Sequence, residues 1–222
     1  DKTELKDFVY TEYLQLLIVK YINEVNLKKS YYLFGAYLNR LFFERSKFGN
    51  TLDFLTEYNT VSDFNLLNEQ IKQELVLEGY EVEIRKETKY KYTYKIALQK
   101  HFDSEIKVHN TYTIHLIYYP VSNYFKPALF KKLKHATHIK GYDINSHIRI
   151  ISTEFSLSTL LKIVYVRKTI DPIELFDIYR LTTTHRQLVE HSFFTPAELK
   201  NLIKTVGIAK QKKKKKKIRA IN

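Results

Sequence analysis

The sequence predicts an α+β fold that ends in a small helical bundle, and the periodicity of its apolar residues carries this prediction. Apolar residues recur at helical spacing in two long segments before residue 79 and again after residue 155, whereas apolar and polar residues alternate between them. A helix repeats every 3.6 residues and a strand every two, so the middle of the chain is expected to form antiparallel strands. With 222 residues, 44% of them hydrophobic, the chain can bury a sizeable core.

The N-terminal part of the chain is predicted to alternate helices with short strands. Apolar side chains at helical spacing predict an amphipathic helix over Asp7–Val25. Tyr31–Phe34 is a short apolar run that ends at Gly35, as expected for a strand that leads into a turn. The next predicted segments are a short helix, a turn and a buried strand, over Ala36–Arg45, Lys47–Asn50 and Leu52–Leu55.

The middle of the chain begins with a second long helix, predicted over Asp63–Glu78. Asp63 is its candidate N-cap, and Gly79 lies just past its end, where a residue with positive φ commonly stops a helix. Three alternating runs follow at 80–85, 90–95 and 112–119, and they predict antiparallel strands. Ile148–Ser152 is a further short predicted strand.

The C-terminal third is predicted to be helical from Phe155 onward. Asp171 precedes Pro172 and is followed three residues later by Glu174, which is the pattern of a capping box at a helix start. Thr195–Glu198 repeats the same pattern. We therefore expect three parts: an α+β domain over 1–150, a helical bundle over 151–206, and a basic tail over 207–222 that is predicted to be disordered.

The positive charge of the chain is concentrated at its C-terminal end. The formal net charge is +13, and the last sixteen residues supply eight positive charges and no negative one, which leaves +5 for residues 1–206. The run Lys212–Lys217 repels itself and is not expected to pack. It is either a solubilising end or a nonspecific contact to phosphates, and RNA is a possible partner in the second case.

Several common functional classes are excluded by missing motifs. The five glycines form no GxG pair, no Walker A loop and no GxSxG nucleophile elbow. The absence of cysteine excludes disulfides, thiolate metal sites and a cysteine nucleophile. No apolar stretch reaches the ~18 residues of a membrane-spanning helix, and no signal-peptide pattern opens the sequence. We therefore expect a cytoplasmic protein that does not bind membranes.

One compact unit is typical of polymerase-β-like nucleotidyltransferases: a strand, a glycine turn, a short helix and a second strand that carries Asp53. A glycine turn at a helix N-terminus lets backbone N–H groups approach phosphate oxygens. Within this class the chain resembles the nucleotidyl transferase AbiEii toxin family. The segments that carry the resemblance are Leu33–Leu38, Phe48–Phe54, Leu160–Ile163 and Glu174–Tyr179.

The resemblance implies an activity and a set of site residues. It implies transfer of a nucleotide from an NTP to an RNA or protein acceptor, with Mg²⁺ as cofactor, as a toxin that is countered by an antitoxin protein. The implied roles are metal binding and catalysis for Asp53, catalysis for Lys162, and contacts to the nucleotide for Gly35, Ala36, Thr51 and Asp177.

The chain departs from the family pattern at three places. Ala36 stands where the family has a second glycine or a serine, and Thr51 stands where it has the first metal-binding aspartate. A third acidic residue is expected on a later strand, but Tyr112–Tyr119 contains none and offers only His115. These departures favour an alternative function, in which a catalytically degenerate nucleotidyltransferase fold serves as a binding module for RNA or a partner protein.

Structural roles compete with the functional ones at most of these positions. Asp53 is either a metal ligand or an ordinary strand residue, and Glu174 is expected to be a capping residue. Lys162 either contacts phosphate or extends its amine to solvent beside apolar neighbours. Asp177 is placed to pair with Lys162 or with Arg180.

Two further segments have functional and structural interpretations. His135 and His138 have a loose metal-like spacing, but lysines surround them, so a surface turn or helix is the favoured interpretation. The run Tyr90–Lys95 alternates tyrosine with lysine or threonine, which suits either stacking on single-stranded RNA or a strand with one packed tyrosine face.

Overall fold

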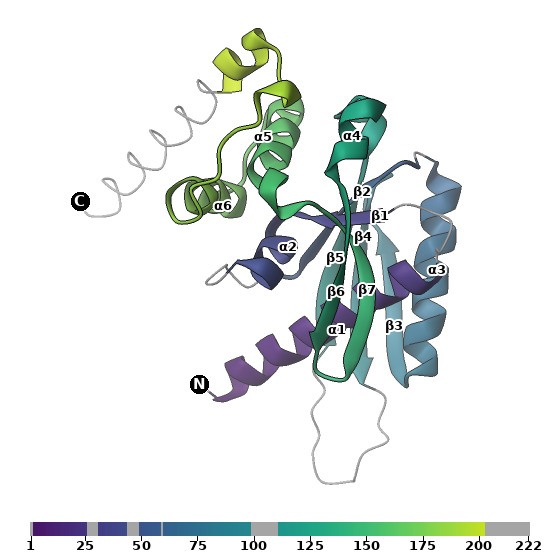
Figure 1. The fold of residues 1–222 in the computed structure, drawn as a ribbon. Helices are drawn as coiled ribbons and strands as arrows, with labels where there is room; N and C mark the ends of the chain where they lie inside the picture. Colours follow the sequence, from purple (N-terminus) through teal and green to yellow (C-terminus); the bar gives the residue numbers. More distant parts are fainter. Residues whose placement is uncertain (1, 26–30, 44–48, 59, 99–110, 203–222) are drawn as a thin grey trace, which may run out of the picture.

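A seven-stranded mixed sheet forms the centre of the molecule (Figure 1). The computed structural model describes residues 2–25, 31–43, 49–58, 60–98 and 111–202. The strand order is β3-β4-β5-β2-β1-β7-β6, in which β2–β5 and β1–β7 are parallel pairs and the other neighbours are antiparallel. The predicted α+β class is therefore confirmed. The strands are β1 (Tyr31–Phe34), β2 (Thr51–Thr56), β3 (Tyr80–Lys86), β4 (Lys91–Leu98), β5 (Thr111–Pro120), β6 (Lys134–Gly141) and β7 (Ile144–Ile151).

Helices cover both faces of this sheet. The helices are α1 (Lys2–Val25), α2 (Gly35–Phe42), α3 (Val61–Leu77), α4 (Pro127–Leu133), α5 (Ser156–Arg167) and α6 (Pro172–Thr183), and short 3₁₀ turns lie at Val121–Asn123, Thr153–Phe155 and His191–Phe193. α1 packs on β7, β5 and β1, while α3 packs on β3 and on α1. α2 packs on β1 and β2, and α5 and α6 pack against each other and against α2.

The alternation of strand residues decides which side chains enter the core and which face α2. On one face, the ring of Tyr118 in β5 stacks on Phe64 of α3 with ring centres 4.7 Å apart. Its hydroxyl and that of Tyr94 both donate to the buried Asn68 side chain, at 3.2 and 2.6 Å, so these buried polar groups are satisfied. Thr51, Asp53, Ile117 and Tyr119 face the opposite side, toward α2.

The predicted segments are recovered with four corrections, and the first is that the helix predicted over Ala36–Arg45 runs from Gly35 to Phe42. The N-cap of α3 is Thr60, whose hydroxyl accepts the backbone N–H of Asp63 at 3.3 Å, so Asp63 lies in the first turn of the helix. His135 and His138 lie on β6, not in a turn or a helix, because this segment pairs with β7 along its whole length. The strand predicted at Ile148–Ser152 starts earlier, at Ile144, because its first residues also pair with β6. Gly79 ends α3 with a φ of +90°, as predicted.

The two predicted capping patterns near the C-terminus are confirmed. Asp171 accepts the backbone N–H of Glu174 at 2.8 Å, and the Glu174 carboxylate accepts the N–H of Asp171 at 2.9 Å. Thr195 and Glu198 form the same reciprocal pair at the start of a helix. The tail over 207–222 and the residues 47 and 48 of the predicted turn lie outside the described residues. In the part of the chain that is described, no helix is both long and apolar enough to cross a membrane.

Candidate functional site

The junction of β1 and α2 is a tight turn that only glycine accommodates without strain. Gly35 has a φ of +76°, and a Cβ added there would lie 2.9 Å from Oδ2 of Asp53. α2 begins directly at Gly35, and the preceding residue Phe34 gives the helix no side-chain cap. The first backbone N–H groups of a helix have no partner within the helix, and together they favour a bound anion. The start of α2 therefore lies beside the Asp53 carboxyl group and has no side-chain cap from Phe34.

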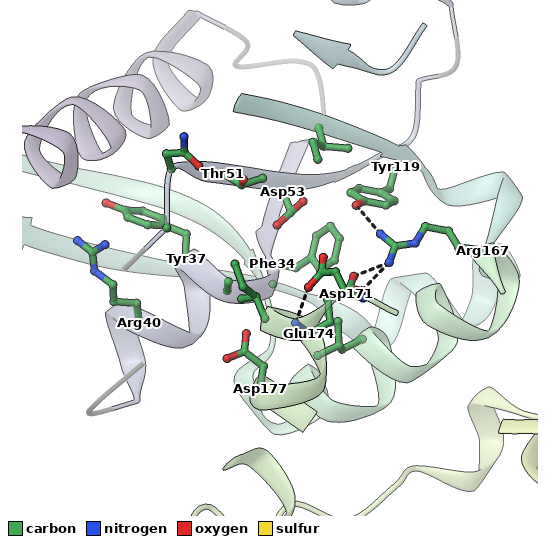
Figure 2. Close-up of a pocket in the computed structure, with 17 residues that line it drawn as sticks. Phe34, Tyr37, Arg40, Thr51, Asp53, Tyr119, Arg167, Asp171, Glu174 and Asp177 are labelled. Atoms are coloured by element: carbon green, nitrogen blue, oxygen red, sulfur yellow. Dashed lines mark hydrogen bonds and ion pairs between the residues drawn. The ribbon is translucent and has the colours of Figure 1, made fainter. Parts of the chain in front are cut away.

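A pocket of about 140 Å³ opens at this turn. Figure 2 shows side chains from β1, α2, β2, β5, α5 and α6 that surround it. Its polar lining consists of residues with charged side chains from four elements, namely Arg40, Asp53, Arg167, Asp171, Glu174 and Asp177, together with Asn50, Thr51 and two tyrosines, Tyr37 and Tyr119. Four carboxyl groups thus face a small space that contains two arginines.

Asp53 lies half-buried at the floor of the pocket, on β2. Burial raises the pKa of its carboxyl group to about 7, and the negative charges of Glu174 and Asp171 act in the same direction. The positive charge of Arg167 and a hydrogen bond from Tyr119 oppose this shift without cancelling it. A large share of Asp53 side chains is therefore protonated near neutral pH.

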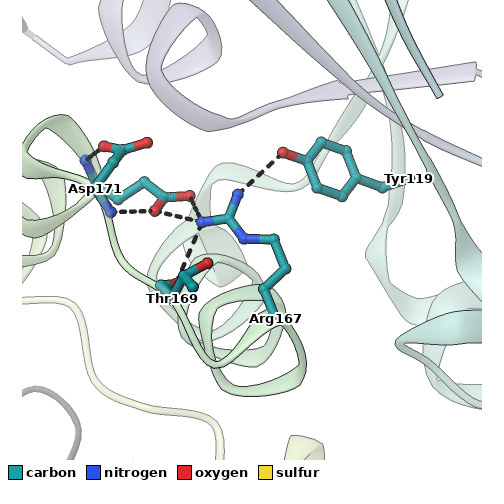
Figure 3. A network of polar contacts seen from close by, with 5 residues as sticks. Tyr119, Arg167, Thr169 and Asp171 are labelled. Carbon is teal, nitrogen blue, oxygen red and sulfur yellow. Dashed lines mark hydrogen bonds and ion pairs between the residues drawn. The ribbon is translucent and has the colours of Figure 1, made fainter. Parts of the chain in front are cut away.

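Arg167 is the centre of a polar network at the wall of the pocket (Figure 3). Its Nη2 donates to both carboxylate oxygens of Glu174, at 2.7 and 2.6 Å, and its Nη1 donates to the Tyr119 hydroxyl at 3.3 Å. Burial raises the pKa of Glu174 although Arg167 and the backbone of Asp171 stabilise its charge. Because Glu174 also belongs to the capping box, one carboxylate joins the start of α6 to the end of α5.

Asp177 connects the pocket to the interface of α6 with α2. It is almost fully buried, and it accepts a hydrogen bond from the Asn39 side chain of α2 at 3.3 Å. Burial raises the pKa of Asp177 to about 6, and the hydrogen bond from Asn39 and the charge of Arg180 moderate this shift. Asp177 therefore holds the two helices together as well as lining the pocket.

The structure brings together five of the six residues that the sequence singled out. Gly35, Ala36, Thr51, Asp53 and Asp177 all line the pocket. Lys162 is not among the residues that line it. Its amine forms an ion pair with Glu198 at 2.8 Å and lies over the ring of Phe194, 5.4 Å from the ring centre, on the other side of α5.

Sequence reasoning missed Arg167 and Tyr119 and assigned Glu174 only a capping role. The capping box did locate Glu174, and Arg167 lies seven residues earlier at the last turn of the preceding helix. No local sequence motif predicts that Arg167 and Glu174 contact each other. They do so because Lys168 ends α5 with a φ of +58°, and this left-handed residue reverses the chain.

The donor set of this pocket does not fit the magnesium site that the family resemblance implies. Thr51, two residues before Asp53 on the same strand, carries no charge, and neither does Ile117, which is paired with Asp53 on the neighbouring strand β5. The carboxylates of Asp171, Glu174 and Asp177 are engaged in the cap, with Arg167 and with Asn39. Among the described residues, no three His, Cys, Asp or Glu side chains form a group that could hold a metal ion.

Comparisons with known proteins give a fold but no family. No protein-family model and no curated protein matches the sequence. An antigenic nucleotidyltransferase-like protein from Paracoccidioides brasiliensis is 12% identical, covers 86% of each chain and has a TM-score of 0.52. A candidate nucleotidyltransferase from Helicobacter pylori is 18% identical over 88% of this chain and 76% of that one, with a TM-score of 0.49.

A second Helicobacter pylori structure, JHP933, is also 18% identical, over 86% of this chain and 70% of that one, with a TM-score of 0.48. The likeness to the AbiEii toxin family remains a prediction from the four sequence segments. At these identities a structural likeness speaks for the fold alone. The chain has a nucleotidyltransferase-like fold.

Proposed function

We propose that this protein binds a nucleotide in the pocket at Gly35 without transferring it, and that it serves as an RNA-binding module. One observation carries this proposal: Asp53 is the only acidic side chain on the two central strands that face the pocket. Transfer of a nucleotide needs divalent cations that several carboxylates hold together with the substrate phosphates. The fold and the glycine turn at Gly35 are present, whereas the carboxylate set is reduced.

The start of α2 is the element that favours phosphate binding. The turn at Gly35 brings the backbone close to Oδ2 of Asp53, and Phe34 gives the N–H donors of the helix no side-chain cap, so the proposed position of a phosphate oxygen is beside these donors. Asp53 lies under this turn, and its raised pKa lets it accept a proton when an anion approaches. A neutral Asp53 removes the charge that would repel a phosphate most directly.

The competing function is the one implied by the family resemblance: Mg²⁺-dependent transfer of a nucleotide from an NTP to RNA or protein, as a toxin with an antitoxin partner. It is favoured by the concentration of four carboxyl groups around one pocket, because carboxylates that repel each other gain from a bound cation. The two functions differ in their dependence on divalent cations, so one set of measurements separates them.

The first test measures nucleotide binding and transfer with the full-length protein. Thermal unfolding is followed with each of the four NTPs, in Mg²⁺ or in EDTA, and transfer is followed with a radiolabelled NTP and total RNA. We expect an NTP to raise the melting temperature in EDTA as well as in Mg²⁺, by an amount that grows with the logarithm of its concentration. We expect no label in the RNA. Divalent-dependent labelling that Asp53→Asn abolishes would replace this proposal with the competing one.

A second test restores the missing carboxylates. Thr51→Asp and Ile117→Asp each add an acid that faces the pocket, one on the strand of Asp53 and one directly beside it on β5. The double variant is expected to gain a Mg²⁺-dependent rise in melting temperature that the natural protein lacks. Thr111→Asp/Ser122→Asp, which adds two carboxylates at exposed neutral positions away from the pocket, is the control, and it should gain no such rise.

A further inference from the structure

One short stretch carries a net positive charge equal to that of residues 1–206 as a whole. Residues 126–149 contain six lysines and arginines and a single acidic residue, Asp143, which gives a net charge of +5. Residues 1–206 together also carry +5, so the rest of residues 1–206 has no net charge. The stretch folds as α4 and the hairpin of β6 and β7, and it is therefore one continuous part of the structure (Figure 1).

Most of these positive side chains are available on the surface. Lys126, Lys131, Lys132 and Lys140 are exposed, and no ion pair joins them to another residue in the described ranges. Lys134 and Arg149 are only partly exposed, and the Lys134 amine pairs with Glu57 at 2.6 Å. Exposed lysines on neighbouring elements attract a polyanion, because each lysine that neutralises a phosphate releases a counterion.

The lysines of the β3–β4 pair have a different environment. Lys91 lies 3.9 Å from Glu87, and Lys95 lies 3.9 Å from Glu83 across the pair of strands. Tyr92 and Tyr94, the rings between these lysines, are buried and donate their hydroxyls to Asn65 and Asn68 of α3. The rings of Tyr92 and Tyr94 are therefore not available to stack on bases. For these two tyrosines the RNA-stacking interpretation of the run Tyr90–Lys95 is excluded.

The hairpin also presents flat rings beside its positive charges. His138 and His147 are directly opposite each other in the β6–β7 register, both are exposed, and their ring centres lie 4.9 Å apart. Tyr142, in the turn of the hairpin, instead contacts α1: its hydroxyl donates to Glu12 at 3.3 Å and its ring packs on Tyr13. Exposed imidazole rings next to lysines are a combination that holds unpaired bases, because every base can stack on them.

We propose that α4 and the β6–β7 hairpin form a binding surface for single-stranded RNA. The lysines contact the phosphates, and His138 and His147 stack on bases. The outward face of the hairpin carries Ala136, His138, Lys140, Asn145, His147 and Arg149, with no large apolar side chain, so it suits a polyanion rather than an apolar partner. This inference takes RNA as the partner from the proposed function. It does not depend on whether the pocket at Gly35 binds a nucleotide.

The test uses full-length protein with Lys212–Lys217 replaced by glutamine, so that the tail does not dominate the signal. Binding of a fluorescent, unstructured 20-nucleotide RNA is followed by anisotropy from 50 to 200 mM salt. The test variant is Lys126→Gln/Lys131→Gln/Lys140→Gln, and the control is Lys86→Gln/Lys91→Gln/Lys95→Gln, which changes the net charge equally. Each phosphate contact on a single strand adds about 0.7 to the slope of log K against log salt, so the test variant should lose about 2 from this slope.

Separate outcomes bear on the surface and on the proposed function. Loss of slope in the test variant alone, with a further loss of affinity in His138→Ala/His147→Ala, supports the surface. Equal losses in the test and control variants would show a general charge effect and overturn it, while RNA binding as such would stand. If the protein with its natural tail does not bind this RNA at 50 mM salt, RNA is not the partner and the proposed module function fails with it. Equal affinity for a duplex of the same length would overturn the single-strand assignment.

Discussion

Asp53 shows how one residue can link the pocket to the stability of the protein. Its pKa is about 7 in the folded protein and ordinarily 3.8, so the native state holds this proton more tightly than the unfolded chain does. The contribution of this proton to the free energy of unfolding is fully present below about pH 4, and it is lost as the pH rises toward 7. Residues that cost stability in this way are common where a site awaits a ligand.

The first prediction is that Asp53→Asn stabilises the protein by an amount that grows as the pH rises above about 4 and is nearly complete at pH 7. At pH 8 the ionised carboxylate costs up to roughly 4 kcal/mol, from a shift of about three pKa units, and asparagine removes that cost. At pH 4 the two proteins should differ little. Urea unfolding at pH 4, 6 and 8 measures the difference, with Asp143→Asn on the exposed hairpin turn as the control. A less stable Asp53→Asn protein at pH 8 would mean that the carboxylate is a structural ligand of its neighbours.

The second prediction compares two glycines that both have positive φ. Gly35→Ala and Gly79→Ala each force a side chain into the left-handed region, at an expected cost of about 1–2 kcal/mol in the free energy of unfolding. A Cβ at Gly79 meets open space, whereas one at Gly35 meets Asp53 Oδ2 at 2.9 Å. Only Gly35→Ala should also abolish nucleotide binding, measured by calorimetry on variants that remain folded. Loss of binding in both would point to a global effect.

The elements of this fold differ in how far the sequence determines them. The strand Tyr31–Phe34 and the capping box of α6 were predictable, because a dense apolar run and a side-chain cap are local signals. β6 was not, since Lys134–Gly141 carries little apolar alternation and becomes a strand by pairing with β7. The five pocket residues predicted from the sequence follow from the glycine turn and the family resemblance, whereas Arg167 depends on how two helices meet.

The third prediction concerns the corner between α5 and α6, which the Arg167–Glu174 pair holds. Both side chains are largely buried, so removing one partner leaves a poorly compensated charge. Arg167→Gln and Glu174→Gln should each lower the free energy of unfolding by about 2–4 kcal/mol, and the double variant by less than their sum. The matched cycle is Lys95→Gln with Glu83→Gln, a pair at 3.9 Å with both side chains more than half exposed. The coupling energy of this exposed pair should lie within about 0.5 kcal/mol of zero. An equally small coupling energy between Arg167 and Glu174 would show that their pair does not stabilise the corner between α5 and α6.

At the scale of the whole molecule, the described chain separates two kinds of charge. The net positive charge of the folded part lies on α4 and the β6–β7 hairpin, and four carboxyl groups gather at the pocket under α2. An anion that enters the pocket must therefore bind among acids, two of which, Asp53 and Asp177, have pKa values of about 7 and about 6. Its approach favours the protonated form of both groups, so binding and proton uptake are linked.

The last prediction uses this linkage to decide between the two functions. If the pocket binds nucleotide without metal, the affinity for an NTP in EDTA should fall as the pH rises from 6 to 8, by up to about tenfold per pH unit for each proton taken up. Calorimetry in two buffers of different ionisation enthalpy counts that proton directly, and Asp53→Asn should flatten the profile. If instead Asp53 must be ionised to hold a cation, affinity in Mg²⁺ should rise over the same range and vanish in EDTA. The two functions thus predict opposite dependences of NTP affinity on pH, and both arise from the carboxyl group of Asp53. An affinity that rises with pH in Mg²⁺ would favour the Mg²⁺-dependent transfer function over the proposed one.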